Sequence, residues 1–164
     1  MVIIGLDLSL SSTGYSIINC KGEILTYGVI STTTKDNDYI RVYKIASRIK
    51  ELIKEYEVDV AVLENSFFGK NPNTGLKLAR LAGAVFYICI ESNIEIEMLA
   101  PTTTRKILLG DGKAKKESVA KFIQDSYINI GKYSDKAGKN KTSDIYDSLC
   151  LGLAYLKRYN LNNK

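Results

Sequence analysis

Histidine is absent from this sequence of 164 residues, so the chain lacks the side chain that most often binds metals or transfers protons near neutral pH. Histidine-dependent catalytic triads, zinc sites that need histidine and phosphohistidine chemistry are therefore excluded. Long apolar runs are also absent. No stretch reaches the ~18 residues that a membrane-spanning helix needs, and we expect no membrane partner. Any catalysis has to use carboxylates, lysines, hydroxyls or cysteines.

Cysteine is scarce, with three residues and no CxxC pair. Cys20, Cys89 and Cys150 lie far apart in the sequence, each within an apolar segment. We expect buried, reduced thiols rather than disulfides, and hence a cytoplasmic location. With 45% hydrophobic and 25% charged residues, the chain is long enough to bury a core without cross-links. We expect residues 1–164 to form a single domain.

The formal net charge of +5 is concentrated in one part of the chain. Residues 100–141 carry ten basic and four acidic side chains, whereas residues 1–99 carry ten basic and twelve acidic ones. A basic segment of this kind suits a polyanion such as nucleic acid, and it equally suits a solvated lysine-rich surface. Three of its lysines, Lys136, Lys139 and Lys141, lie in a loop rich in lysine and glycine, where we expect them to contact phosphate.

Hydrophobic periodicity predicts three strands followed by alternating helices and strands. The expected strands are 2–8, 13–20, 23–31, 58–65 and 94–99, and the expected helices are 38–57, 74–92, 101–109, 114–127 and 143–158. The Val-rich segment 58–65 is typical of a strand buried on both faces. This order predicts an α/β fold whose mixed central sheet has three antiparallel strands and then βαβ units, flanked by helices.

The expected helix 74–92 carries an apolar stripe, which we expect to pack mainly in the core. The stripe comprises Leu76, Ala79, Gly83, Phe86 and Ile90. Because Gly83 is small, it would also permit close packing against another helix across a dimer.

Four carboxylates occupy places where a core normally rejects charge. Asp7 and Glu64 end two apolar strands, and Asp144 and Asp147 lie three residues apart on one face of the last helix. Taken singly, Asp144 could be a helix cap and Asp7 a turn former. If all four converge, their repulsion calls for cations, and oxygen ligands favour Mg²⁺ or Mn²⁺. Two such ions ~3.5–4 Å apart hydrolyse phosphodiesters, so a two-metal phosphodiesterase is our hypothesis.

An aromatic pair, Phe67 and Phe68, lies in a loop rich in glycine, lysine and asparagine. Such a pair can pack in the core. In a loop of this composition we favour the alternative, stacking on nucleobases.

Three segments resemble the RuvC family of Holliday-junction resolvases, within the RNase H-like superfamily. They are GLDLSLSSTGY at 5–15, LENSFFGKN at 63–71 with the following LKLARLAGAV, and SDIYDSLCLGLAY at 143–155. The lysine-rich GDGKAKKESV matches a further family segment. The resemblance implies an RNase H-like fold and a homodimeric endonuclease that cuts four-way or other branched DNA. It also implies two Mg²⁺ ions per active site, with Mn²⁺ as a substitute.

The resemblance assigns roles to individual residues. It places Asp7, Glu64, Asp144 and Asp147 on the family's metal-binding carboxylates, and Lys116 on its catalytic lysine. Phe67 falls on the aromatic residue that probes bases at the junction, with Phe68 beside it. The other residues expected to contact DNA are Lys70, Asn71, Arg105, Lys113, Lys115, Lys136, Lys139 and Lys141. Lysine outnumbers arginine 18 to 5, as in AT-rich genomes, which suggests a bacteriophage or a low-GC bacterium as the source.

Three other functions compete with this interpretation. DLSLSSTG also resembles the phosphate loop of sugar kinases and actin-like ATPases, but those proteins need a second domain for which 164 residues leave no room. Another RNase H-like nuclease, acting on RNA–DNA hybrids, stays open, although in that group the matching Glu lies on a helix and Glu64 is expected to end a strand. A nonhydrolytic module that binds branched DNA also stays open, although four acids without metals would only repel DNA.

Overall fold

A five-stranded sheet forms the centre of the computed structural model, which describes residues 1–65, 72–130 and 142–162. The strands are β1 (Val2–Asp7), β2 (Ser12–Asn19), β3 (Ile24–Ser31), β4 (Val60–Glu64) and β5 (Glu95–Leu99), in the spatial order β3-β2-β1-β4-β5. β1 pairs antiparallel with β2, and β2 with β3, whereas β4 is parallel to both β1 and β5. The predicted mixed sheet is confirmed.

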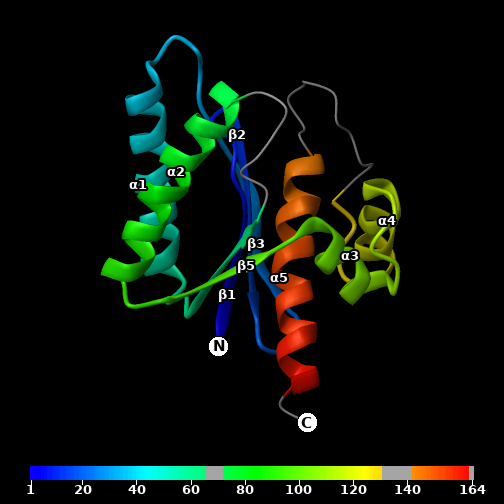
Figure 1. Cartoon of the computed structure of the whole chain (residues 1–164). Coiled ribbons are helices and arrows are strands. Elements are labelled where there is room, and N and C mark those ends of the chain that lie inside the picture. The colour runs from blue at the N-terminus through cyan, green and yellow to red at the C-terminus, as the bar shows by residue number, and fades with distance from the viewer. Residues whose placement is uncertain (66–71, 131–141, 163–164) are drawn as a thin grey trace.

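Helices cover both faces of the sheet (Figure 1). α1 (Asp38–Glu55) and α2 (Pro72–Glu91) pack on one face, and α5 (Thr142–Asn162) packs on the other. α3 (Pro101–Leu109) and α4 (Lys116–Ser126) contact the side of α5 that faces away from the sheet. Each face of the sheet has its own hydrophobic cluster, and β4 is buried on both faces as predicted. Within the described residues, no helix is long and apolar enough to cross a membrane.

The prediction of three buried thiols is wrong for one cysteine. Cys89 and Cys150 are buried, but Cys20 is exposed. The reason is local, because β2 ends at Asn19 and Cys20 begins the turn to β3, outside the sheet.

The predicted core face of α2 is also wrong. The residues of this helix that are buried are Leu81, Ala82, Val85, Ile88 and Cys89. Leu76 and Ile90, from the stripe expected in the core, are instead 53% and 71% exposed. α2 carries apolar side chains on two faces, and periodicity alone cannot tell which face meets the sheet.

Helix α5 packs directly on the backbone of β1 and β2. A Cβ atom at Gly5 would lie 2.1 Å from the carbonyl oxygen of Ser148, and one at Gly14 would lie 2.0 Å from that of Asp144. No side chain fits at either position without displacing the helix. Since Gly14 pairs with Asp7 across the β1–β2 ladder, this contact brings the first turn of α5 to the end of β1.

On the opposite face of the sheet, a buried arginine holds the loop between β1 and β2. Arg41 of α1 is only 6% exposed. Its guanidinium donates to Ser11 Oγ at 3.2 Å and to Thr32 Oγ1 at 2.9 Å, and it pairs with Asp38 at 3.3 Å. These bonds satisfy a buried charge and tie the loop that follows Asp7 to α1.

We expect Gly14→Ala to lower the free energy of unfolding by about 1–3 kcal/mol, because the methyl group has to push α5 off the sheet. Gly152→Ala, on α5, is the matched control. Its Cβ would lie nearest to the Cδ1 atom of Ile18, at 3.2 Å, a side-chain end that can shift, and the nearest backbone atom, the nitrogen of Gly5, would be 3.9 Å away. Urea unfolding followed by circular dichroism measures both variants. Equal stability of Gly14→Ala and Gly152→Ala would contradict the packing argument.

Candidate active site

Two of the four predicted carboxylates end neighbouring parallel strands. Asp7 is the last residue of β1 and Glu64 the last of β4. Leu6 pairs with Leu63 in the parallel ladder, so the acids follow at adjacent positions on the same edge of the sheet. This is the carboxyl edge of the parallel strands, where ligands of open α/β sheets bind.

The other two carboxylates lie in the first turns of α5, which the contact at Gly14 holds against β2. The hydroxyl of Ser12 donates to Oδ2 of Asp144, and that of Ser143 lies 3.3 Å from Oδ1. Asp144 thus lies in the first turn of α5, with its carboxylate oxygens close to hydroxyl groups. The carboxylate of Asp7 accepts no hydrogen bond from the described residues, so the side chain does not act as a turn former.

The four acids lie close enough to influence one another's charge. Burial raises the pKa of Asp7 to about 8, and the negative charges of Asp147, Glu64 and Asp144 add to that effect. The ammonium group of Lys116 acts in the opposite direction without cancelling it. Each of these groups therefore lies close enough to Asp7 to change its titration.

Lys116, the first residue of α4, donates a hydrogen bond to Oδ2 of Asp147 and forms an ion pair with it. Burial works against the charge of Lys116, but the carboxylates of Asp147, Asp7 and Glu64 outweigh it and raise the pKa of the ammonium. The pKa of Asp147 is itself raised by burial, which Lys116 only partly offsets. The lysine thus lies among the acids as their counter-charge.

A small cavity at this edge of the sheet is lined by two acidic and two basic residues, Glu64, Asp147, Lys116 and Arg105. Its volume is about 20 Å³, close to the space that one water molecule needs. The remaining lining residues are Pro101, Thr104, Val119, Cys150 and Leu151.

The donors of this site suit a hard divalent cation. All four acids offer oxygen donors, and no described residue donates a hydrogen bond to the Asp7 carboxylate. Among those residues, however, no three acidic or cysteine side chains are already gathered tightly enough to hold an ion. Like charges repel when no cation lies between them. A cation would have to bring the oxygens together.

The structure thus brings six residues predicted from the sequence to one region: Asp7, Glu64, Arg105, Lys116, Asp144 and Asp147. Lys113 and Lys115 are exposed just before α4. Seven predicted DNA contacts lie outside the described residues: Phe67, Phe68, Lys70, Asn71, Lys136, Lys139 and Lys141. The contact of Ser12 with Asp144 was not predicted, and the available signal was its position two residues before Gly14 on one face of β2.

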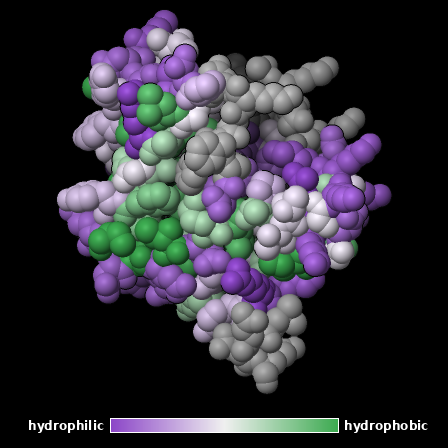
Figure 2. Space-filling view, viewed as in Figure 1, coloured by the Kyte–Doolittle hydropathy of each residue, from purple (hydrophilic) through white to green (hydrophobic). Residues whose placement is uncertain are grey.

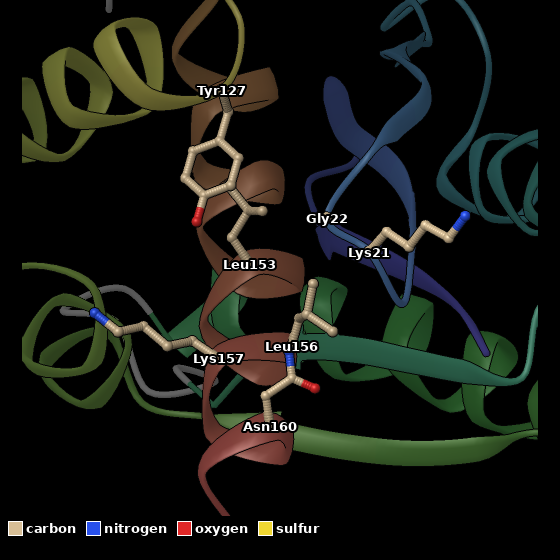
Figure 3. Close-up of a pocket in the computed structure, with 7 residues that line it drawn as sticks. All are labelled: Lys21, Gly22, Tyr127, Leu153, Leu156, Lys157 and Asn160. Atoms are coloured by element: carbon tan, nitrogen blue, oxygen red, sulfur yellow. The ribbon is translucent and has the colours of Figure 1, made fainter.

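A larger cavity, of about 270 Å³, lies toward the other end of α5 (Figure 3). Leu153, Leu156 and Tyr127 form much of its wall, while the side chains of Lys21 and Lys157 extend away from it. No acidic residue lines it. We therefore place the chemistry at the carboxylates and not here.

Comparison with known proteins gives a consistent result. The sequence profile of the family described as "Crossover junction endodeoxyribonuclease RuvC" matches residues 3–154. The protein of that name from Natranaerobius thermophilus is 29% identical, and the match covers 100% of this chain and 99% of that protein. The corresponding protein from Dictyoglomus turgidum is 30% identical, with 95% and 96% covered.

Solved structures confirm the fold. RuvC from Thermus thermophilus gives a TM-score of 0.83 at 21% identity, with 99% of this chain and 97% of that chain covered. The Holliday junction resolvase of fowlpox virus gives a TM-score of 0.60 at 20% identity, with 96% and 99% covered. The predicted RNase H-like sheet is the fold that these proteins share with the chain.

The raised pKa of Asp7 makes stability depend on pH. The carboxyl titrates near 3.8 when unfolded and at about 8 when folded, so the folded state binds its proton more tightly. This stabilisation is complete below about pH 4 and is lost as the pH rises through about 8. In EDTA at pH 8, we expect the free energy of unfolding of Asp7→Asn to exceed that of wild type by about 1–3 kcal/mol. The difference should vanish near pH 4.

Urea unfolding between pH 4 and pH 9 measures this effect. The matched control is Asp125→Asn, an exposed aspartate on α4, which should show no pH-dependent difference from wild type. An Asp7→Asn effect that is the same at every pH would show that the charge of Asp7 is not its cause.

Proposed function

Because the chain belongs to the crossover junction endodeoxyribonuclease RuvC family, we propose that it cuts four-way (Holliday) junctions or other branched DNA by hydrolysing phosphodiester bonds. The observation that carries the proposal is the convergence of Asp7, Glu64, Asp144 and Asp147 from β1, β4 and α5 around Lys116. A site made only of carboxylates and basic groups suits phosphoryl chemistry. It offers no histidine and no reactive thiol, since burial raises the pKa of the nearby Cys150 to about 11.

A divalent metal ion is general to this nuclease family. We propose that the ion is Mg²⁺, with Mn²⁺ as a substitute, and that each site takes two, held by Asp7, Glu64, Asp144 and Asp147. Bound in a pair, such ions supply an activated water and neutralise charge on the leaving oxygen. The four carboxylates would hold the pair, and because each is only partly exposed, water would compete less for their oxygens.

The two basic residues of the cavity act on the phosphate. Lys116 already carries its proton, because the surrounding acids raise its pKa, so it can hold a scissile phosphate and stabilise charge that develops there. Arg105 lines the same cavity and gives a second cation for the backbone of the DNA. Lys113 and Lys115, exposed beside them, extend this basic surface.

The remaining predicted contacts complete the proposed DNA surface. Phe67, with Phe68 beside it, would stack on bases at the branch point, and Lys70 and Asn71 would continue that loop. Lys136, Lys139 and Lys141 precede α5 in the sequence and would contact phosphate groups. We also propose that residues 1–164 act as one domain, and that the protein works in the cytoplasm.

We further propose a homodimer that associates through the exposed face of α2. Leu76, Tyr87 and Ile90 are 53%, 67% and 71% exposed, and with Gly83 they follow one stripe along the helix. Figure 2 shows hydrophobic side chains gathered over the C-terminal end of α2, at the lower left. A two-fold axis through such a stripe would pair two active sites, as two symmetry-related cuts require.

We expect Asp7→Asn to reduce junction cleavage below ~1% of wild type while junction binding stays close to normal, because it removes one ligand charge and leaves the basic surface intact. The substrates are a four-way junction, a Y-shaped fork, linear duplex and an RNA–DNA hybrid, each with Mg²⁺, Mn²⁺ or EDTA. Gel-shift titration in EDTA measures binding, and Asp125→Asn is the control.

Each alternative has its own outcome in this assay. Equal cleavage by Asp7→Asn and wild type rejects the proposed site. Preference for the hybrid supports an RNase H-type activity, and junction binding without cleavage by wild type supports a nonhydrolytic module.

Ile90→Glu tests the dimer, because a carboxylate within an apolar interface would be buried without a partner. We expect sedimentation analysis to show a monomer, and paired cutting of the junction to be lost. Leu25→Glu on β3, where the side chain is 45% exposed, is the matched control and should stay dimeric. A dimeric Ile90→Glu protein would exclude this face.

A further inference from the structure

Ser12, the first residue of β2, makes a contact with the site to which no role has yet been given. Its hydroxyl donates to Oδ2 of Asp144, and its side chain is 3% exposed. A serine hydroxyl has one proton to donate, and here that proton goes to a carboxylate oxygen. Because the bond is charge-assisted and shielded from water, it restricts the rotation of the Asp144 side chain.

The backbone around Ser12 is itself held in place. Ser12 pairs with Ser31 in the β2–β3 ladder, and the preceding Ser11 receives a hydrogen bond from the buried Arg41. Two residues on, Gly14 lies against the backbone of Asp144. β2 thus contacts Asp144 twice, through a side chain and through the main chain, and a rigid strand defines where its carboxylate lies.

We propose that Ser12 is a positioning residue, which holds one oxygen of Asp144 so that the other is oriented toward a divalent metal ion. This inference rests on the proposed metal site. Hydrogen-bond partners of metal ligands typically change metal affinity or activity by about 10–100-fold when they are removed. The Ser143 hydroxyl, 3.3 Å from Oδ1, lies on the same helix turn as Asp144 and cannot anchor it to the sheet.

The same strand supplies a matched control. Ser16 lies four residues after Ser12, so both serines face α5. Ser16 is also buried, but its hydroxyl has no hydrogen-bond partner among the described residues. Ser16→Ala therefore removes the same atom from the same face of β2 without touching Asp144.

Calorimetric titration of the metal-free full chain with Mn²⁺ tests the role directly. We expect Ser12→Ala to bind Mn²⁺ about 10–100-fold more weakly than wild type, with Ser16→Ala unchanged. Ser12→Thr keeps the hydroxyl and should keep most of the affinity. In junction cleavage, the Mn²⁺ concentration for half-maximal rate should rise by the same factor in Ser12→Ala, while the rate at saturating Mn²⁺ changes little.

A purely structural role would lower thermal stability without shifting this metal dependence. Wild-type Mn²⁺ affinity in Ser12→Ala overturns the inference, and so does an equal loss in Ser12→Ala and Ser12→Thr. If wild type binds Mn²⁺ through Asp7 but cuts no branched DNA, the proposed function fails while the role of Ser12 stands.

Discussion

The direct contact between α5 and the backbone of β1 and β2 is the constraint on which the site depends. Gly5 and Gly14 allow the helix to approach within a distance that any side chain would prevent. Without that approach, Asp144 and Asp147 would stand off from the strand ends by the thickness of a side-chain layer, because helices normally pack on sheets through side chains. By allowing this close packing, the two glycines bring the acids of β1, β4 and α5 together in one group.

That grouping has an energetic cost, which the surrounding contacts limit. Burial is the main cause of the raised pKa of Asp7, and repulsion among the four carboxylates at this partly buried edge adds to it. Lys116 supplies one positive charge, and the Ser12 hydroxyl supplies a fixed dipole to Asp144. On the other face of the sheet, Arg41 anchors the loop after Asp7. These favourable contacts offset the repulsion among the acids. A cation that binds the folded site would stabilise the fold further.

Sequence patterns predicted the order of the strands, the mixed sheet and the acids at the element ends, because alternation and burial leave a direct mark on residue type. They did not predict which face of α2 meets the sheet, because apolar side chains lie on both its buried and its exposed face. They also missed Ser12 and Arg41, whose roles come from contacts between residues 132 and 30 positions apart. A single polar residue forms no repeating pattern in the sequence, so its long-range partner cannot be predicted from periodicity.

The distribution of the acids along the chain has a consequence for synthesis. Asp7 and Glu64 belong to β1 and β4, but Asp144 and Asp147 belong to α5, the last helix that is described. A ribosome therefore finishes all five described strands before the residues that complete the acidic group emerge. Long-range contacts of this kind form late in folding. A nascent chain, or a fragment cut before α5, holds half of the acids, so the proposed metal site can assemble only after α5 has been made and has packed on the sheet.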